Sequence, residues 1–148
     1  MAKRMSLDAV MHFQTALLTD DDYTSATWTP GRCKNVTLNM ETAEADVTER
    51  GSEWEEILEG IKRASIEVEI VHDPDNPFYA ALVTAWKTRG GIALAAMDGP
   101  IDTPPAEGLA GNFTVLNMTR TEQLEEAVMS TFTIKPRSFV DYWELAAA

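Results

Sequence analysis

The side chains that could act as bases or nucleophiles in this sequence are few and scattered. It contains two histidines, His12 and His72, and a single cysteine, Cys33. No histidine or other base lies near Cys33 in the sequence, so we interpret it as a buried or incidental thiol. His72 continues the apolar alternation of a predicted strand, which favours a structural imidazole over a catalytic one. The sequence therefore predicts no nucleophilic site.

Two acidic clusters have the residue types of a cation site or a glycosidase. Residues 20–22 are three consecutive aspartates, whose carboxylates would point in different directions, and this is typical of a solvated run. Four glutamates between residues 53 and 59 have the spacing of a solvated helical face, which argues against paired catalytic carboxylates. No zinc, calcium or phosphate-binding motif is present. We therefore predict no catalytic residue, no metal and no cofactor, and we expect the protein not to be an enzyme.

The bulk composition indicates one acidic globular domain. The chain has 148 residues, of which 45% are hydrophobic, and 24 acidic against 12 basic residues give a net charge of −12. This length predicts a single domain, 1–148, with one core. The negative charge opposes direct binding to nucleic acid. No apolar run approaches the ~20 residues that cross a bilayer, so we expect no membrane insertion.

Alternating apolar residues predict strands in two regions. Val36, Leu38 and Met40 alternate with polar residues, and the pattern continues to residue 47. In the predicted strand 64–72, the isoleucines and valine face one side, and Glu67 and Glu69 face the other. The turn at residues 49–52 is followed by apolar residues at helical spacing up to Ile61, which predicts a short helical turn with Ser52 at its start.

The clearest predicted element is a helix at about residues 76–89. Asn76 is a good N-cap, and Pro77 suits the first helical position. Phe78, Leu82 and Trp86 belong to one apolar stripe and are the predicted helix packing residues. Gly90 and Gly91 would end the helix.

Further strands are predicted at residues 92–97, 112–119 and 127–136, with a surface loop at 101–108. The alanines of 92–97 suit close packing beneath the helix. The segment 112–119 has apolar residues on both faces, which predicts that another subunit covers one of them. The predicted fold class is mainly β, an antiparallel sandwich or barrel with one flanking helix, an N-terminal arm at about 1–30 and a C-terminal tail at about 138–148.

Read in order, several segments resemble the tail tube proteins of long-tailed bacteriophages, particularly those with non-contractile tails. The resemblance covers roughly residues 30–137 and rests on the order and spacing of segments 34–40, 45–51, 58–69, 73–86, 92–99, 111–117 and 124–136. It implies a β-sandwich or barrel with a flanking helix, a fold also found in the tube of the type VI secretion system.

The resemblance also implies a function. Such subunits form hexameric rings that stack into a tube, and DNA and the tape-measure protein occupy the lumen without sequence-specific binding. The loop that reaches a neighbouring ring would correspond here to Glu49, Arg50, Gly51, Ser52, Glu53 and Trp54. We expect Glu67 and Glu69 to face the lumen or an interface. We expect assembly in the host bacterial cytoplasm and a final place in the virion tail.

Two other functions remain open at this point. A phage neck or tail-end protein of the same fold would form a single ring and stop. A monomeric β-barrel module would bind a small apolar ligand inside its barrel.

Overall fold

The computed structural model describes residues 10–20, 22–101, 105–122, 124 and 127–145, and within them the chain is mainly β. It forms one seven-stranded antiparallel sheet, one α-helix and one 3-10 helix. The helices are η2 (Tyr23–Ser25) and α1 (Pro77–Thr88), and the strands are β1 (Val10–Gln14), β2 (Thr29–Gly31), β3 (Asn35–Asp46), β4 (Ile57–Val71), β5 (Ile92–Met97), β6 (Ala106–Thr121) and β7 (Met129–Leu145). The predicted fold class is confirmed.

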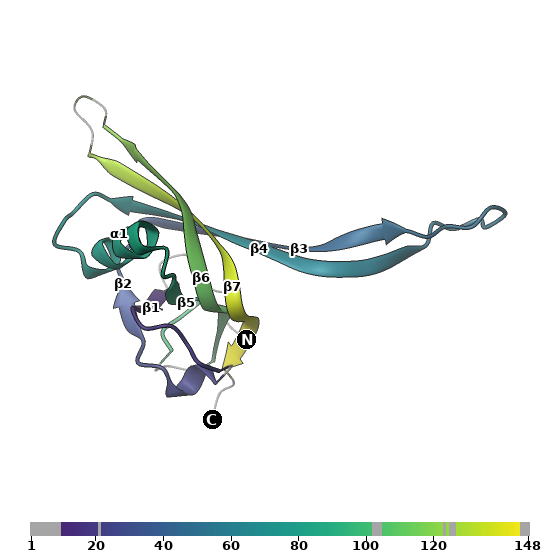
Figure 1. Cartoon of the computed structure of the whole chain (residues 1–148), viewed down its shortest axis with the longest axis horizontal. Helices are drawn as coiled ribbons and strands as arrows, with labels where there is room; N and C mark the ends of the chain where they lie inside the picture. Colours follow the sequence, from purple (N-terminus) through teal and green to yellow (C-terminus); the bar gives the residue numbers. More distant parts are fainter. Residues whose placement is uncertain (1–9, 21, 102–104, 123, 125–126, 146–148) are drawn as a thin grey trace.

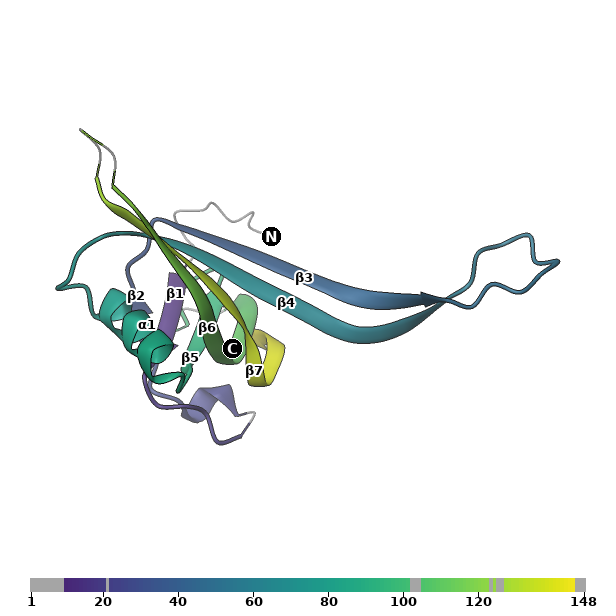
Figure 2. The ribbon, with the colours of Figure 1, turned by 45° about the horizontal axis from the view of Figure 1, so that its top comes forward.

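The strands are hydrogen-bonded in the order β2-β1-β5-β6-β7-β4-β3, so β2 and β3 are the two edges of one continuous sheet. Figure 1 shows that this sheet is strongly bent, with α1 against one side of the body. The paired strands β3 and β4 run out of the body as a long two-stranded ribbon, which Figure 2 shows from a second direction.

The main core lies between α1 and the sheet. Asn76 caps the helix by accepting a hydrogen bond from the Phe78 N–H at 3.1 Å, and its own amide donates to the Arg32 carbonyl at 3.0 Å. Phe78 and Leu82 are fully buried, whereas Trp86 is 44% exposed. The predicted helix is confirmed. Trp86 lies eight residues after Phe78, and the helical rotation over that distance turns it from the core towards the surface.

A second, smaller core lies on the other face of β5. Ala93 and Ala95 pack there against Leu18 and Tyr23 of the N-terminal segment. The prediction that the alanines of this strand lie beneath the helix was wrong for these two residues. The helix side of β5 carries Ile92, Leu94 and Ala96, because successive side chains of a strand point to opposite faces and Ala93 and Ala95 fall on the other one.

The buried Asn112 holds this N-terminal segment in place. Its amide oxygen accepts a hydrogen bond from the Leu18 N–H at 2.7 Å, and its amide nitrogen donates to the Leu18 carbonyl at 2.9 Å and to the Ser138 hydroxyl at 3.0 Å. The Asn112 side chain thus bonds to both the N–H and the C=O group of Leu18, as the backbone of a neighbouring strand would. Buried polar groups are satisfied only by such partners, so Asn112 fixes the position of a segment 94 residues away.

Replacing Asn112 with alanine should lower the free energy of unfolding by about 2–4 kcal/mol, because it leaves the buried N–H and C=O groups of Leu18 without their partner. Urea unfolding at protein concentrations that keep the chain monomeric would measure the loss. Asn117→Ala is the matched control, since Asn117 is exposed on the same strand. Equal effects of the two substitutions would contradict the role of Asn112.

The ribbon contains a bulge near its midpoint. The register passes from Thr42 opposite Lys62 to Glu44 opposite Glu59, so Ala43 faces two residues, Gly60 and Ile61. The predicted helical turn in this region was wrong, because β4 begins at Ile57. The bulge shifts by one residue the alternation of apolar and polar side chains along β4. The apolar residues then fall at spacings that resemble those of a helix.

A second bulge corrects the interpretation of β6. The register shifts between Val115 and Asn117, so Leu116 is displaced from the ladder and Met118 returns to the side of the main core, opposite Phe132. The segment 112–119 is therefore not apolar on both faces, and within it only Leu116, 54% exposed, is a large apolar residue left uncovered. The prediction of a loop at 101–108 was also wrong for its last three residues, since β6 begins at Ala106. Residues 102–104 of this predicted loop lie outside the described part of the chain.

Candidate functional site

The residues that could do chemistry are dispersed over the body. His12 is buried in β1, and His72 lies edge-on against the ring of Tyr79, with ring centroids 5.0 Å apart. Within the described residues, no three His, Cys, Asp or Glu side chains are grouped so as to hold a metal ion. The same part of the chain contains no helix of the length and apolarity that a membrane crossing requires.

Cys33 packs partly buried against the main core, and this burial raises the pKa of its thiol above the ordinary value. Folding therefore favours the protonated thiol, and the stability that this provides is present at neutral pH and is lost as the pH rises through the raised pKa. Because the thiolate is the reactive form, we expect alkylation by iodoacetamide at pH 8 to be at least about tenfold slower in the folded chain than in urea. Equal rates in the two states would show that Cys33 is freely accessible.

The loop at the end of the ribbon has an ordered set of local hydrogen bonds. The Ser52 N–H donates to the Glu49 carbonyl at 3.1 Å, and the Ser52 hydroxyl donates to the Trp54 carbonyl at 2.8 Å. Gly51 has a φ of 96°, which suits glycine at the turn. These bonds hold the six residues of the predicted inter-ring loop, Glu49 to Trp54, at the far end of the ribbon (Figure 1).

Large apolar side chains are exposed along the ribbon. Trp54 and Ile61 are each 79% exposed, and Met40 and Leu58 are also largely exposed. Sequence reasoning singled out Trp54 but missed the others, because it placed Leu58 and Ile61 on a short helix. The sequence did contain a signal for this. Around Gly60, apolar residues occupy both odd and even positions, which is typical of a strand interrupted by a bulge.

The ribbon is also strongly acidic. Residues 41–63 contain eight acidic and three basic side chains. Glu44 lies directly opposite Glu59 in the ladder, and like charges in such a pair repel each other. A ribbon with exposed apolar groups and uncompensated negative charge has the composition of a contact surface for a partner that carries positive charge.

Glu67 and Glu69 lie on the face of β4 turned away from the core. Their cross-strand neighbours on β7 are Thr133 and Thr131, and Thr37 lies opposite Glu67 on β3. The neighbouring Ile66 and Val68, which alternate with the glutamates, are fully buried. The two carboxylates therefore stand together on a polar, threonine-rich surface of the sheet.

The sequence matches no family model and no curated protein. The tail of an empty gene transfer agent particle, obtained by helical refinement with C6 symmetry, has a TM-score of 0.73 at 14% identity, with 95% of this chain and 99% of that chain covered. The SPP1 tail tube gives a TM-score of 0.72 at 14% identity, covering 98% of this chain and 80% of that chain. This chain has the phage tail-tube fold.

A third solved structure with the tail-tube fold is the six-fold symmetrised baseplate of the anti-feeding prophage. Its TM-score is 0.67 at 8% identity, with 99% of this chain and 97% of that chain covered.

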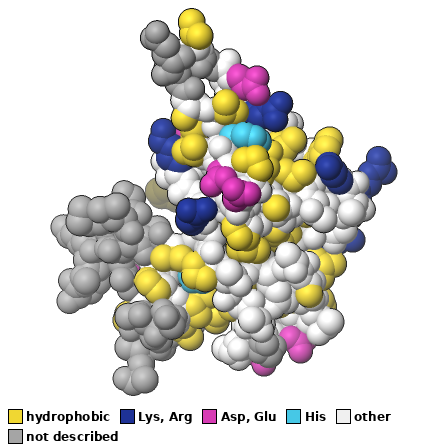
Figure 3. Space-filling model, turned by 90° about the vertical axis from the view of Figure 1, so that its left-hand side faces the viewer, with side chains coloured by type: hydrophobic (Ala, Val, Ile, Leu, Met, Phe, Trp, Pro, Cys, Tyr) yellow, Lys and Arg dark blue, Asp and Glu magenta, His cyan; other side chains and the backbone are white. Residues whose placement is uncertain are grey.

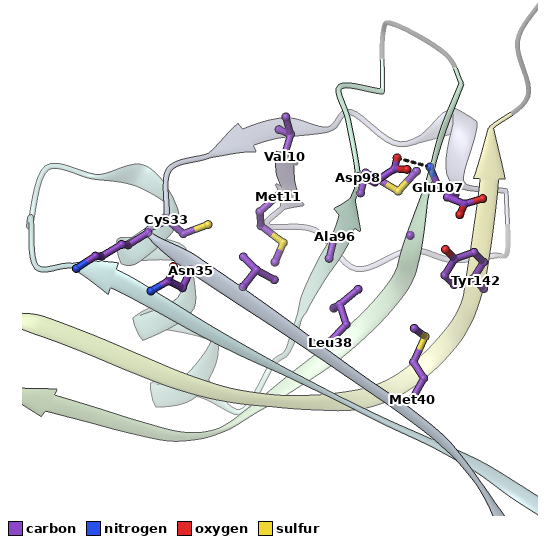
Figure 4. A pocket seen from close by; sticks show the side chains of 14 residues that line it. Val10, Met11, Cys33, Asn35, Leu38, Met40, Ala96, Asp98, Glu107 and Tyr142 are labelled. Carbon is purple, nitrogen blue, oxygen red and sulfur yellow. Dashed lines mark hydrogen bonds between the residues drawn. The ribbon is translucent and has the colours of Figure 1, made fainter. Parts of the chain in front are cut away.

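In this tail-tube fold, a groove of about 400 Å³ with both polar and apolar lining residues opens between β3 and the ends of β1 and β5. Figure 4 shows Met11 and Leu38 on opposite sides of it, with the Asp98 carboxylate accepting a hydrogen bond from the Glu107 N–H at 2.9 Å. Burial, a hydrogen bond with Glu107 and nearby carboxylates raise the pKa of Tyr142 at the rim. The volume lies in the range of small-molecule sites, roughly 300–1,000 Å³.

A second groove, of about 500 Å³, lies between the end of α1 and β6. Its apolar residues are Trp86, Val115 and Leu116, and its charged residues are Lys87 and Arg89. Figure 3 shows the end of the molecule at the left of Figure 1, where basic, acidic and apolar side chains lie beside one another.

Proposed function

We propose that this protein is the structural subunit of a bacteriophage tail tube and not an enzyme. It would self-assemble into hexameric rings that stack into a tube, in the host bacterial cytoplasm, and would remain in the virion tail. DNA and the tape-measure protein would occupy the lumen without sequence-specific contacts.

The observation that carries this proposal is the ribbon of β3 and β4. A two-stranded ribbon alone is at best marginally stable in water, and this one exposes Trp54, Ile61, Leu58 and Met40. Exposed apolar surface that continues over one element marks an interaction site. Identical copies of the chain would cover it, since the tail-tube structures with this fold come from assembled particles.

The lumen proposal concerns the acidic face of the sheet. A channel wall that conducts DNA must not bind it, and carboxylates repel phosphates. The net charge of −12 and the position of Glu67 and Glu69 on a polar face support an acidic lumen or interface there. A tube reconstruction that places both carboxylates away from the lumen and from every subunit contact would refute this assignment.

Electron microscopy of the purified protein over a range of concentrations tests the function. We expect rings at low concentration and tubes of uniform diameter at high concentration, with six-fold symmetry in cross-section. A protein that remains monomeric at every concentration, and that forms no ordered polymer in any virion, would contradict the proposal. A monomeric small-ligand module using the groove of Figure 4 would give that result.

The similarity to a baseplate chain favours one alternative, a neck or tail-end protein that forms a single ring. The same micrographs separate the two functions, because a tail-end protein would give rings that do not stack. Adding the tape-measure protein would lengthen tubes but leave such rings unchanged.

A further inference from the structure

The groove between α1 and β6 combines an apolar floor with a positive rim. Trp86 and Leu116 are about half exposed there, although both are large apolar residues. Lys87 and Arg89 lie beside them at the end of the helix. An exposed tryptophan next to cationic groups is a common composition for a surface that becomes the centre of a protein interface.

Among the described residues, no ion pair balances the positive charge around this groove. Arg137 donates a hydrogen bond to the Arg89 carbonyl at 3.0 Å, and Lys135 lies opposite Thr114, which lines the groove. In the described part of the chain, the ion pairs join Arg32 to Asp73 and Arg120 to Glu122, away from this cluster. Four basic side chains therefore gather here without a carboxylate partner among the described residues.

The end of the ribbon has the complementary composition. Trp54 is 79% exposed and lies between Glu53 and Glu55, with Glu56 next along the chain. A large aromatic side chain can fill an apolar groove of this size while the flanking carboxylates meet the lysine and arginine of its rim. The groove beside β3 has Asp98 and Glu107 at its rim, and these carboxylates would repel the glutamates of the tip.

We propose that the tip of the ribbon, Trp54 with Glu53 and Glu55, docks into the Trp86–Leu116 groove of a second copy of this chain. The tip lies at the far end of the long axis from the body that carries α1, so it cannot reach the groove of its own chain (Figure 1). A contact between two different surfaces of identical copies propagates from copy to copy, as stacking requires. This inference rests on the proposed tube function and names the receiving site of its inter-ring loop.

Photo-crosslinking identifies the receiving site directly. With p-benzoylphenylalanine in place of Trp54 in the full-length protein, irradiation of assembled tubes should join this position to peptides that contain residues 86–89 or 114–116 of another copy. Tubes that crosslink elsewhere would overturn the docking site but not the tube function. Failure of the unmodified protein to form any polymer would overturn both.

Charge reversal tests the complementarity. Glu53→Lys with Glu55→Lys at the tip, or Lys87→Glu with Arg89→Glu at the groove, should each raise the concentration needed for assembly by at least about tenfold. All four substitutions together should restore assembly, because they re-form the pairs with opposite polarity.

The matched control combines the groove reversals with Glu44→Lys and Glu59→Lys at the middle of the ribbon. It has the same net charge as the rescuing combination but leaves the tip acidic, so we expect it not to assemble. Rescue by this control, or no rescue by the fourfold variant, would overturn the proposed pairing.

Discussion

Shortening the ribbon is expected to abolish tube formation while leaving the body folded. The Val47 N–H donates to the Glu56 carbonyl at 2.9 Å, so these two residues lie opposite each other across the ribbon. Residues 48–55 can therefore be replaced by Asn-Gly, which closes a two-residue hairpin on such a pair. The change removes Trp54 and three glutamates from the tip. Because the tip lies far from both cores, the melting temperature of the monomer should change by no more than about 2 °C.

Ser52→Ala provides the length-matched control. It removes the hydrogen bonds between Ser52 and Trp54 but keeps the tryptophan, so we expect it to assemble at a moderately higher concentration than the unmodified protein. Electron microscopy and sedimentation of the three proteins at equal concentrations would measure the difference. If the shortened protein forms tubes as readily as the unmodified one, the tip is not an assembly contact.

The largest effect on stability is expected for Phe78→Ala, which should lower the free energy of unfolding by about 3–5 kcal/mol. Phe78 is fully buried, and its ring centroid lies 5.2 Å from that of Phe13. The backbone at Gly31 lies so close that an added Cβ would come within 2.7 Å of the ring. Backbone and aromatic neighbours cannot collapse readily into the space left by the ring, so most of the cavity would persist.

Trp86→Ala is the control within the same helix. Its side chain is half exposed over a groove, so its loss should lower the free energy of unfolding by about 1 kcal/mol or less. Both substitutions are best measured by urea unfolding in the shortened-ribbon background, where assembly does not contribute to stability. A Phe78 effect no larger than the Trp86 effect would show that α1 is not anchored through Phe78.

Elements with strong local signals were predictable from the sequence. The Asn76 cap, the following proline and the stripe from Phe78 to Ala85 sufficed for α1, and the alternation around Ile66 sufficed for the inner half of β4. These signals are local because capping and amphipathic periodicity depend on neighbours within a few residues.

The features that were missed depend on contacts between distant segments. Only the paired strand shows that Leu116 is displaced by a bulge, and only the folded chain brings Leu18 to Asn112. The acidic residues at the tip of the ribbon were visible in the sequence as one cluster. The basic groove between α1 and β6 was not visible, because the end of α1, β6 and β7 each contribute part of it.

The bulge at Ala43 makes the ribbon most compliant near its midpoint. Inwards of it, β4 is held by β7 and the main core; at the bulge the ladder is interrupted, and Gly60 has no side chain to stiffen it. Sideways load on the tip would therefore bend the ribbon at this point before it disturbed the body. An assembly joined through such elastic arms could curve as a whole while every subunit and every docked end kept its own geometry.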